Sequence, residues 1–168
     1  IDVYVAGRYA YVANGSSSTL SIVDISSPFS MSVVTTTFVG GGPSSVYVQG
    51  SYAYVAASTT DRLVVIDVGD AARPKLVAQV PVDDDPRSVT VQGRYAYVAN
   101  LAPSSMNVVD IGNPLGPVVV ATTTISGSLQ PVNIAVQGRY AYVADQSAGN
   151  LVIVDVSNAT NPTVVTTF

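Results

Sequence analysis

The sequence has 168 residues, of which 48% are hydrophobic and 11% are charged, and its formal net charge is −4. It contains no cysteine, histidine, tryptophan or glutamate, which excludes disulfides, thiolate metal sites, cysteine nucleophiles and histidine bases. The acidic balance argues against a nucleic-acid partner, which would favour a basic surface. No apolar run approaches the ~18 residues of a transmembrane segment, and the Val, Ile and Tyr runs broken by Gly, Pro, Ser and Asn are typical of β-sheet.

One seven-residue stretch, Gly-Arg-Tyr-Ala-Tyr-Val-Ala at Gly7–Ala13, occurs four times. It returns at 50–56, with Ser in place of Arg, at 93–99 and at 138–144, so that successive copies are 43, 43 and 45 residues apart. Self-similarity at this period predicts a repeat architecture.

Each repeat begins with two predicted strands joined by a glycine hairpin. The first strands are expected at 2–6, 45–49, 88–92 and 132–137. The Tyr-Ala-Tyr-Val-Ala run that follows each glycine is the second strand, with both tyrosines on one face and small residues on the other. Large rings opposite small residues favour packing between stacked sheets, and an exposed aromatic ladder for sugars or bases is the alternative interpretation.

The third and fourth strands complete each repeat. Apolar third strands are expected at 20–24, 63–67, 106–110 and 151–155, each ending in an Asp. An Asx turn, in which the carboxylate accepts backbone N–H groups, explains why an Asp stands there. The alternative is a metal site shared by several of these Asp residues, but equivalent turns of a radial repeat lie too far apart to share an ion. Fourth strands rich in Val and Thr are expected at 32–38, 75–80, 118–125 and 163–168, and one helical turn is expected at Asp70–Lys75.

Four antiparallel strands in about 43 residues form the blade unit of a β-propeller. The fullest copy, Val136–Pro162, contains Leu151-Val-Ile-Val-Asp155 and resembles the LVIVD-repeat family of β-propellers, found largely in bacterial and archaeal surface or secreted proteins. The resemblance implies an all-β propeller domain over residues 1–168, with four four-stranded antiparallel blades at about 1–38, 44–80, 87–125 and 132–168. It supplies no shared catalytic residues.

The number of blades leaves three arrangements open, since propellers close with about 4–8 blades. The chain could form a closed four-bladed ring, half of an eight-bladed ring made by two copies, or part of a longer propeller. Self-association, or contact with further blades or protein subunits, is therefore the expected partnership.

Two sets of connections differ most among the repeats. The first joins the second and third strands, at 14–19, 57–61, 100–105 and 145–150, and the other joins each fourth strand to the next repeat, at 39–43, 81–86 and 126–131. Divergent loops on a uniform frame favour a binding surface, and neutral drift is the alternative. The candidate residues of this loop face are Asn14, Asp61, Asn100, Asp145 and Asn150.

Two further loop features are candidate sites. The cluster Asp83, Asp84 and Asp85 is a weak candidate for Ca²⁺, since it lacks the alternating spacing of a calcium loop and is better explained as an exposed acidic turn. Asn14 and Asn158 begin Asn-x-Ser/Thr triplets and are candidate glycan attachment sites.

These observations predict a non-catalytic extracellular or cell-surface propeller without a cofactor, acting as a structural or protein-interaction module, for example in a filament or surface assembly. One alternative is a propeller that binds a glycan, peptide or Ca²⁺ through the loop face. The other is a hydrolase or lyase on the propeller scaffold.

Overall fold

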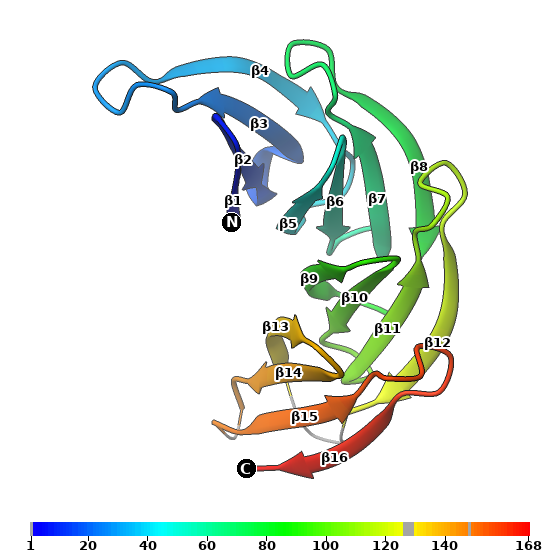
Figure 1. Cartoon of the computed structure of the whole chain (residues 1–168). Helices are drawn as coiled ribbons and strands as arrows, with labels where there is room; N and C mark the ends of the chain where they lie inside the picture. The colour runs from blue at the N-terminus through cyan, green and yellow to red at the C-terminus, as the bar shows by residue number, and fades with distance from the viewer. Residues whose placement is uncertain (1, 126–129, 148) are drawn as a thin grey trace.

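The computed structural model describes residues 2–125, 130–147 and 149–168. These residues form four separate antiparallel sheets, each of four strands that follow one another in chain order (Figure 1). The all-β propeller prediction is confirmed, with blades of four strands.

The strands of the first two blades have the following bounds. Blade one consists of β1 (Asp2–Ala6), β2 (Tyr9–Asn14), β3 (Thr19–Asp24) and β4 (Ser32–Phe38), with one 3₁₀ turn at Gly15–Ser17. Blade two consists of β5 (Pro43–Gln49), β6 (Tyr52–Ala57), β7 (Arg62–Asp67) and β8 (Lys75–Pro81).

The last two blades repeat this order. Blade three consists of β9 (Pro86–Gln92), β10 (Tyr95–Asn100), β11 (Ser105–Asp110) and β12 (Val118–Thr124). Blade four consists of β13 (Pro131–Gln137), β14 (Tyr140–Asp145), β15 (Leu151–Asp155) and β16 (Thr163–Thr167).

Two local features differ from the sequence-based expectation. The helical turn predicted at Asp70–Lys75 is wrong: the Arg73 N–H donates to the Asp70 carbonyl in a single turn, and Lys75 already begins β8. The inner strands of blades two, three and four begin at a proline, ahead of the expected start. The ladder to the second strand shifts register next to Pro43, Pro86 and Pro131. A proline is tolerated there because the register shift interrupts the ladder.

The hairpin after each inner strand depends on a glycine in the left-handed region. The φ angles of Gly7, Gly50, Gly93 and Gly138 are 59°, 61°, 62° and 63°. Because L side chains rarely adopt this conformation, the glycine has a structural role at each repeat.

The core lies between the blades, where the tyrosine face of one blade meets the Val/Ala face of the next. Tyr11 and Leu20 of blade one share a buried cluster with Ala53 and Val55 of blade two. The same contact repeats between blades two and three, around Tyr54, and between blades three and four, around Tyr97. The tyrosine repeat therefore packs blade against blade, as its period predicts.

The blades form an open arc rather than a closed ring of four (Figure 1). Blades two and three are covered on both sides, whereas blades one and four each leave one face uncovered. Val3 of β1 is 58% exposed and Leu151 of β15 is 40% exposed, although their equivalents in the covered blades, Val46 and Leu63, are buried. Of the three predicted arrangements, the closed four-bladed ring is therefore wrong, because the step from one blade to the next is too small to bring blade four back to blade one.

Candidate functional site

The inner strands carry one polar residue each at the same position, near the axis around which the blades are arranged. This inner polar row consists of Asp2, Ser45, Ser88 and Asn133, which are 43, 43 and 45 residues apart. The strands β1, β5, β9 and β13 bring these residues side by side although the sequence separates them by whole repeats.

Hydrogen bonds link the row residues of blades one, two and three to the blade that follows each of them. The Ser45 hydroxyl donates to Asp2 Oδ2 over 2.9 Å, and the Ser88 hydroxyl donates to Asn133 Oδ1 over 3.2 Å. Each oxygen in turn accepts a backbone N–H of the next blade: Val46 to Asp2 at 3.0 Å, Val89 to Ser45 at 3.2 Å, and Ile134 to Ser88 at 3.3 Å. A serine hydroxyl suits this position because it donates once and still accepts.

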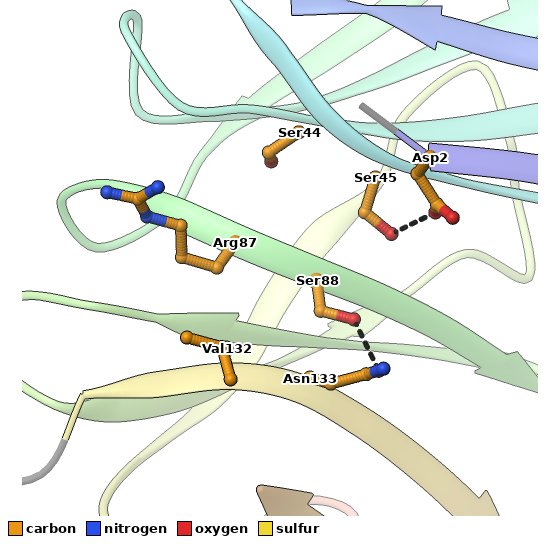
Figure 2. A pocket seen from close by; sticks show the side chains of 7 residues that line it. All are labelled: Asp2, Ser44, Ser45, Arg87, Ser88, Val132 and Asn133. Atoms are coloured by element: carbon orange, nitrogen blue, oxygen red, sulfur yellow. Dashed lines mark hydrogen bonds between the residues drawn. The ribbon is translucent and has the colours of Figure 1, made fainter. Parts of the chain in front are cut away.

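The row forms one wall of a cavity of about 190 Å³. Its other lining residues are Ser44, Arg87 and Val132, and Figure 2 shows Asp2 and the Arg87 guanidinium at opposite ends of it. The lining combines a carboxylate, hydroxyls, an amide and a guanidinium, which are the groups that recognise a small polyhydroxylated or anionic molecule.

Asp2 is held firmly but keeps some capacity to accept hydrogen bonds. Its Oδ1 accepts the Val3 N–H at 2.8 Å, and its Oδ2 accepts the Ser45 hydroxyl and the Val46 N–H. A carboxylate has about four acceptor sites, so one remains for a water or a ligand hydroxyl.

Arg87 is positioned by an ion pair at the rim of the cavity. Its guanidinium lies 2.6 Å from Asp85 Oδ2, and both side chains are partly exposed to solvent. The neighbouring Ser44 hydroxyl donates to the Pro86 carbonyl at 2.6 Å, which links blades two and three. The cation is therefore held at the cavity without being buried, and it can contact an anionic or polar ligand.

The predicted loop-face residues have largely structural contacts. Asn100 is 0% exposed and its amide donates to Ser105 and Asn107, while the buried Asp145 accepts the Gln130 N–H at 2.6 Å. Asp61 accepts the Asp85 N–H at 2.9 Å. The side chains of Asn100 and Asp145 are therefore buried and hold the loops in place, and they do not lie at the surface.

Asn14 and Asn150, the other two loop-face candidates, are half-buried. The Asn14 amide donates to Thr19 and Ser21, and the Asn150 carbonyl accepts the Asp145 N–H. Residue 148 of the last loop lies outside the described residues.

The acidic cluster does not bring its carboxylates together. Asp83 accepts the Ser105 hydroxyl, whereas Asp85 pairs with Arg87, so neighbouring carboxylates turn toward different partners. Among the described residues, no group of three or more acidic side chains is arranged to hold a metal ion. The Ca²⁺ candidate, including Asp84, stays a prediction.

The two candidate glycosylation sites differ in accessibility. Asn158 is exposed, and its Oδ1 accepts the Thr160 N–H and hydroxyl. The Asn14 amide nitrogen, to which a glycan would attach, is already engaged by Thr19 and Ser21. Asn158 is therefore the better placed of the two.

The predicted Asx turns are confirmed in all four blades. Each terminal Asp accepts a backbone N–H two residues on at 2.9 Å; the four residues are Asp24, Asp67, Asp110 and Asp155. In blades one, three and four the repeat arginine also pairs with this Asp. The hydrogen bond from Arg139, followed by those from Ser157, lowers the pKa of Asp155 to about 2.

The sequence-based predictions place the candidate site in the variable loops and do not include the inner polar row. Its signal is nevertheless present: Asp2, Ser45, Ser88 and Asn133 share one repeat position and differ in chemistry within an otherwise uniform strand. Arg87 similarly shares a position with Ser44 and Val132, and only blade three places a cation there.

Strand count, blade order and the tyrosine contacts define the chain as part of a β-propeller. The LVIVD repeat model matches residues 1–37, 40–82, 85–124 and 131–168, and the chain therefore belongs to the LVIVD repeat family. The comparison with curated proteins gives no match.

Solved structures with the same fold are only distantly related in sequence. A protein from Lactobacillus plantarum has a TM-score of 0.89 at 15% identity, over 99% of this chain and 56% of its own. The periplasmic gluconolactonase of Pseudomonas aeruginosa has a TM-score of 0.84 at 19% identity, over 99% of this chain and 56% of its own. The hydrazine synthase of Kuenenia stuttgartiensis has a TM-score of 0.79 at 18% identity, over 98% of this chain and 48% of its own. The chain thus spans about half the length of these structures.

The prediction that the chain is not an enzyme is contradicted by these comparisons. The gluconolactonase and the candidate 6-phosphogluconolactonase of Bacteroides uniformis, at 16% identity, share the fold of this chain and are named as enzymes. The prediction relied on the missing histidine and glutamate, but the cavity shows that aspartate, arginine and hydroxyl groups meet near the axis without them. At these identities the likeness itself concerns the fold alone.

The described residues contain no helix long and apolar enough to cross a membrane.

Proposed function

We propose that this chain is a hydrolase of small cyclic esters of the sugar-lactone class, acting in the cavity beside the inner polar row. The observation that carries the proposal is that the Asp2 carboxylate, the Ser44 hydroxyl and the Arg87 guanidinium line one cavity, with Asp2 and Arg87 at its two ends. The gluconolactonase names among structures of the same fold support this substrate class.

The proposed reaction needs only two catalytic groups from the protein, a base and a cation. Lactones react with water more readily than open esters, so a carboxylate base and one cation suffice. Asp2, with its remaining acceptor site, orients the attacking water and takes its proton. When the bond between the carbonyl carbon and the ring oxygen breaks, Asp2 returns this proton to the ring oxygen. Arg87 provides positive charge toward the oxygen on which negative charge develops. Ser44 and Asn133 then bond the ring hydroxyls of the substrate and hold it in place.

Hydrolysis of glucono-δ-lactone, followed by pH-stat titration against the spontaneous rate in the same buffer, tests the proposal. We expect a rate above the spontaneous one, which Asp2→Asn lowers by about 100-fold and Arg87→Gln by about 10-fold or more. Asp70→Asn, which changes an exposed turn carboxylate on blade two, should leave the rate unchanged. A rate equal to that of buffer alone rejects the proposed hydrolysis.

A second candidate function is binding of a sugar acid in the same cavity without turnover. It is favoured by the three hydrogen bonds that Asp2 already accepts, which hold the carboxylate in place and leave one acceptor site for a ligand hydroxyl. Calorimetric titration with gluconate separates the two: binding with no hydrolysis supports this candidate.

We also propose an extracellular or periplasmic location. The support is the periplasmic origin named for the P. aeruginosa structure and the exposed Asn158 triplet. Fractionation of source cells, with the protein recovered only from the cytoplasm, would reject it.

A further inference from the structure

The chain carries both halves of its own blade-to-blade contact, and each half is left uncovered at one end of the arc. The leading face is the uncovered side of blade one, formed by the exposed Val3 and Val5 and the half-buried Val12. The trailing face is the uncovered side of blade four, formed by Asn133, Ala135, Tyr142, Ala144 and Leu151, around a largely apolar hollow of about 250 Å³. Both faces have buried equivalents in the other blades.

The trailing face repeats a surface that is covered three times within the chain. Leu20, Leu63 and Met106 occupy the position of Leu151 in the other blades, and each is 0% exposed because the next blade packs on it. Leu151 is 40% exposed. The uncovered side of β15 therefore has the shape and chemistry of a surface that a following blade covers.

The leading face repeats the other side of the same contact. Val48 and Val91, the equivalents of Val5, are buried against the preceding blade, whereas Val5 is 57% exposed. Val12 is half-buried, although its equivalents Val55 and Val98 are fully buried. This side of blade one is therefore a surface that a preceding blade covers.

The polar groups at the two faces are also complementary. At the internal contacts, Gln49 and Gln92 donate to the carbonyls of Gly93 and Gly138 in the next blade, over 2.8 and 2.7 Å. The corresponding glutamine of blade four, Gln137, is exposed, and its side-chain amide donates to no described residue. The glycine that would accept from it is the equivalent of Gly93, which in blade one is Gly7.

The residues at the two ends of the inner polar row also lack, on their uncovered side, the blade-to-blade hydrogen bonds that their equivalents form. Val46, Val89 and Ile134 donate their N–H groups to the row residue of the preceding blade, but Val3 donates to its own neighbour Asp2. At the other end, the amide nitrogen of Asn133 donates to no described residue. Both ends of the row therefore lack the neighbouring blade that Ser45 and Ser88 have on each side.

We infer that two copies of this chain pair head to tail, with the trailing face of each copy against the leading face of the other. The two contacts are identical and close an eight-bladed ring, as a heterologous contact does when the rotation closes. The open arc and the length of the similar structures, about twice that matched by this chain, fit this closure (Figure 1). The pairing also completes the inner polar row and so the wall of the axial cavity. It does not rest on the proposed hydrolysis.

The solution mass of the 168-residue chain, measured by light scattering on a sizing column, tests the pairing. We expect twice the 17.3 kDa of one copy. Leu151→Asp on the trailing face and Val5→Asp on the leading face should each give a monomer, because either change spoils both contacts of the ring. Val118→Asp, on an equally exposed outer strand of blade three, should stay paired.

Mixing the two monomeric variants distinguishes head-to-tail pairing from other contacts. Leu151→Asp keeps an intact leading face and Val5→Asp keeps an intact trailing face, so an equimolar mixture should recover a dimer through one good contact. Circular dichroism confirms that each variant is folded. A monomeric wild type at millimolar concentration overturns the inference and assigns the open faces to blades beyond this sequence. A ladder of larger masses, or a dimer that survives both substitutions, also overturns it.

Discussion

At the scale of single residues, the ion pair between Arg139 and Asp155 makes the free energy of unfolding depend on pH in the acidic range. The pKa of Asp155 is lowered to about 2, chiefly by the Arg139 hydrogen bond, so below its ordinary pKa the unfolded chain binds the proton more readily. The contribution of this ion pair to the free energy of unfolding is complete above about pH 5 and is lost as the pH falls toward 2. We expect Asp155→Asn to flatten the fall in melting temperature between pH 5 and pH 2, measured by circular dichroism.

Two observations would check this origin of the acid dependence. Asp70→Asn removes an exposed carboxylate that has no arginine partner and should keep the wild-type slope. High salt should reduce the effect, since the Arg139 side chain is mostly exposed. An Asp155→Asn variant with the full wild-type slope would contradict the assignment to this ion pair.

Blade two offers the reverse experiment, because it has Ser51 where the other blades have arginine. Asp67 already accepts the Gly69 N–H in the same Asx turn. Lys75 lies opposite it in β8, but no ion pair links Asp67 to a basic side chain of the described residues. Ser51→Arg should form the pair seen at Arg94 and Asp110, where Nε lies 2.8 Å from Oδ1, and raise the melting temperature by about 1–3 °C. Ser51→Gln, similar in size but uncharged, should give no such gain, and an equal gain would show that the effect is not ionic.

At the scale of elements, the hairpin between β9 and β10 depends on the backbone freedom of Gly93. Its φ of 62° is strained for an alanine, and Gly93→Ala should lower the free energy of unfolding by about 1 kcal/mol or more. Gly93→Asn should lose less, because asparagine tolerates the left-handed region. Urea denaturation measures both, and an equal loss in the two variants would mean that conformation is not the cause.

The elements themselves were largely predictable, and the site was not. The alternation of Tyr, Ala and Val and the hairpin glycines predict strands and faces because these are local properties of each repeat. The sequence predicts a variable loop at Asn100, yet Asn100 ends β10 and is buried. Its side-chain amide donates to Ser105 and Asn107 in the next strand. The inner polar row escaped prediction because its partners lie one whole repeat away, and only the arrangement of blades brings them together.

At the scale of the whole molecule, the open arc follows from the rotation between neighbouring blades. That rotation is set by how Tyr11, Tyr54 and Tyr97 fill the spaces between blades, and no local pattern encodes its value. The sequence could therefore predict four blades but not whether four blades close. As a consequence, the blades differ in burial: blades two and three are covered on both sides, and blades one and four are covered on one side only.

Hydrogen exchange should show this unevenness and its removal by pairing. In the monomeric Val5→Asp variant, amides of β6 and β10 should exchange far more slowly than those of β2 and β14, because the end blades open locally at lower cost. Covering one exposed valine contributes about 1.5 kcal/mol, or roughly tenfold in the opening equilibrium. In a paired wild type, β2 and β14 should therefore be protected at least tenfold more than in the variant, while β6 and β10 change little. Uniform exchange across the four blades of the monomer would show that the arc unfolds as one unit, in which case the covering of its ends stabilises every blade equally.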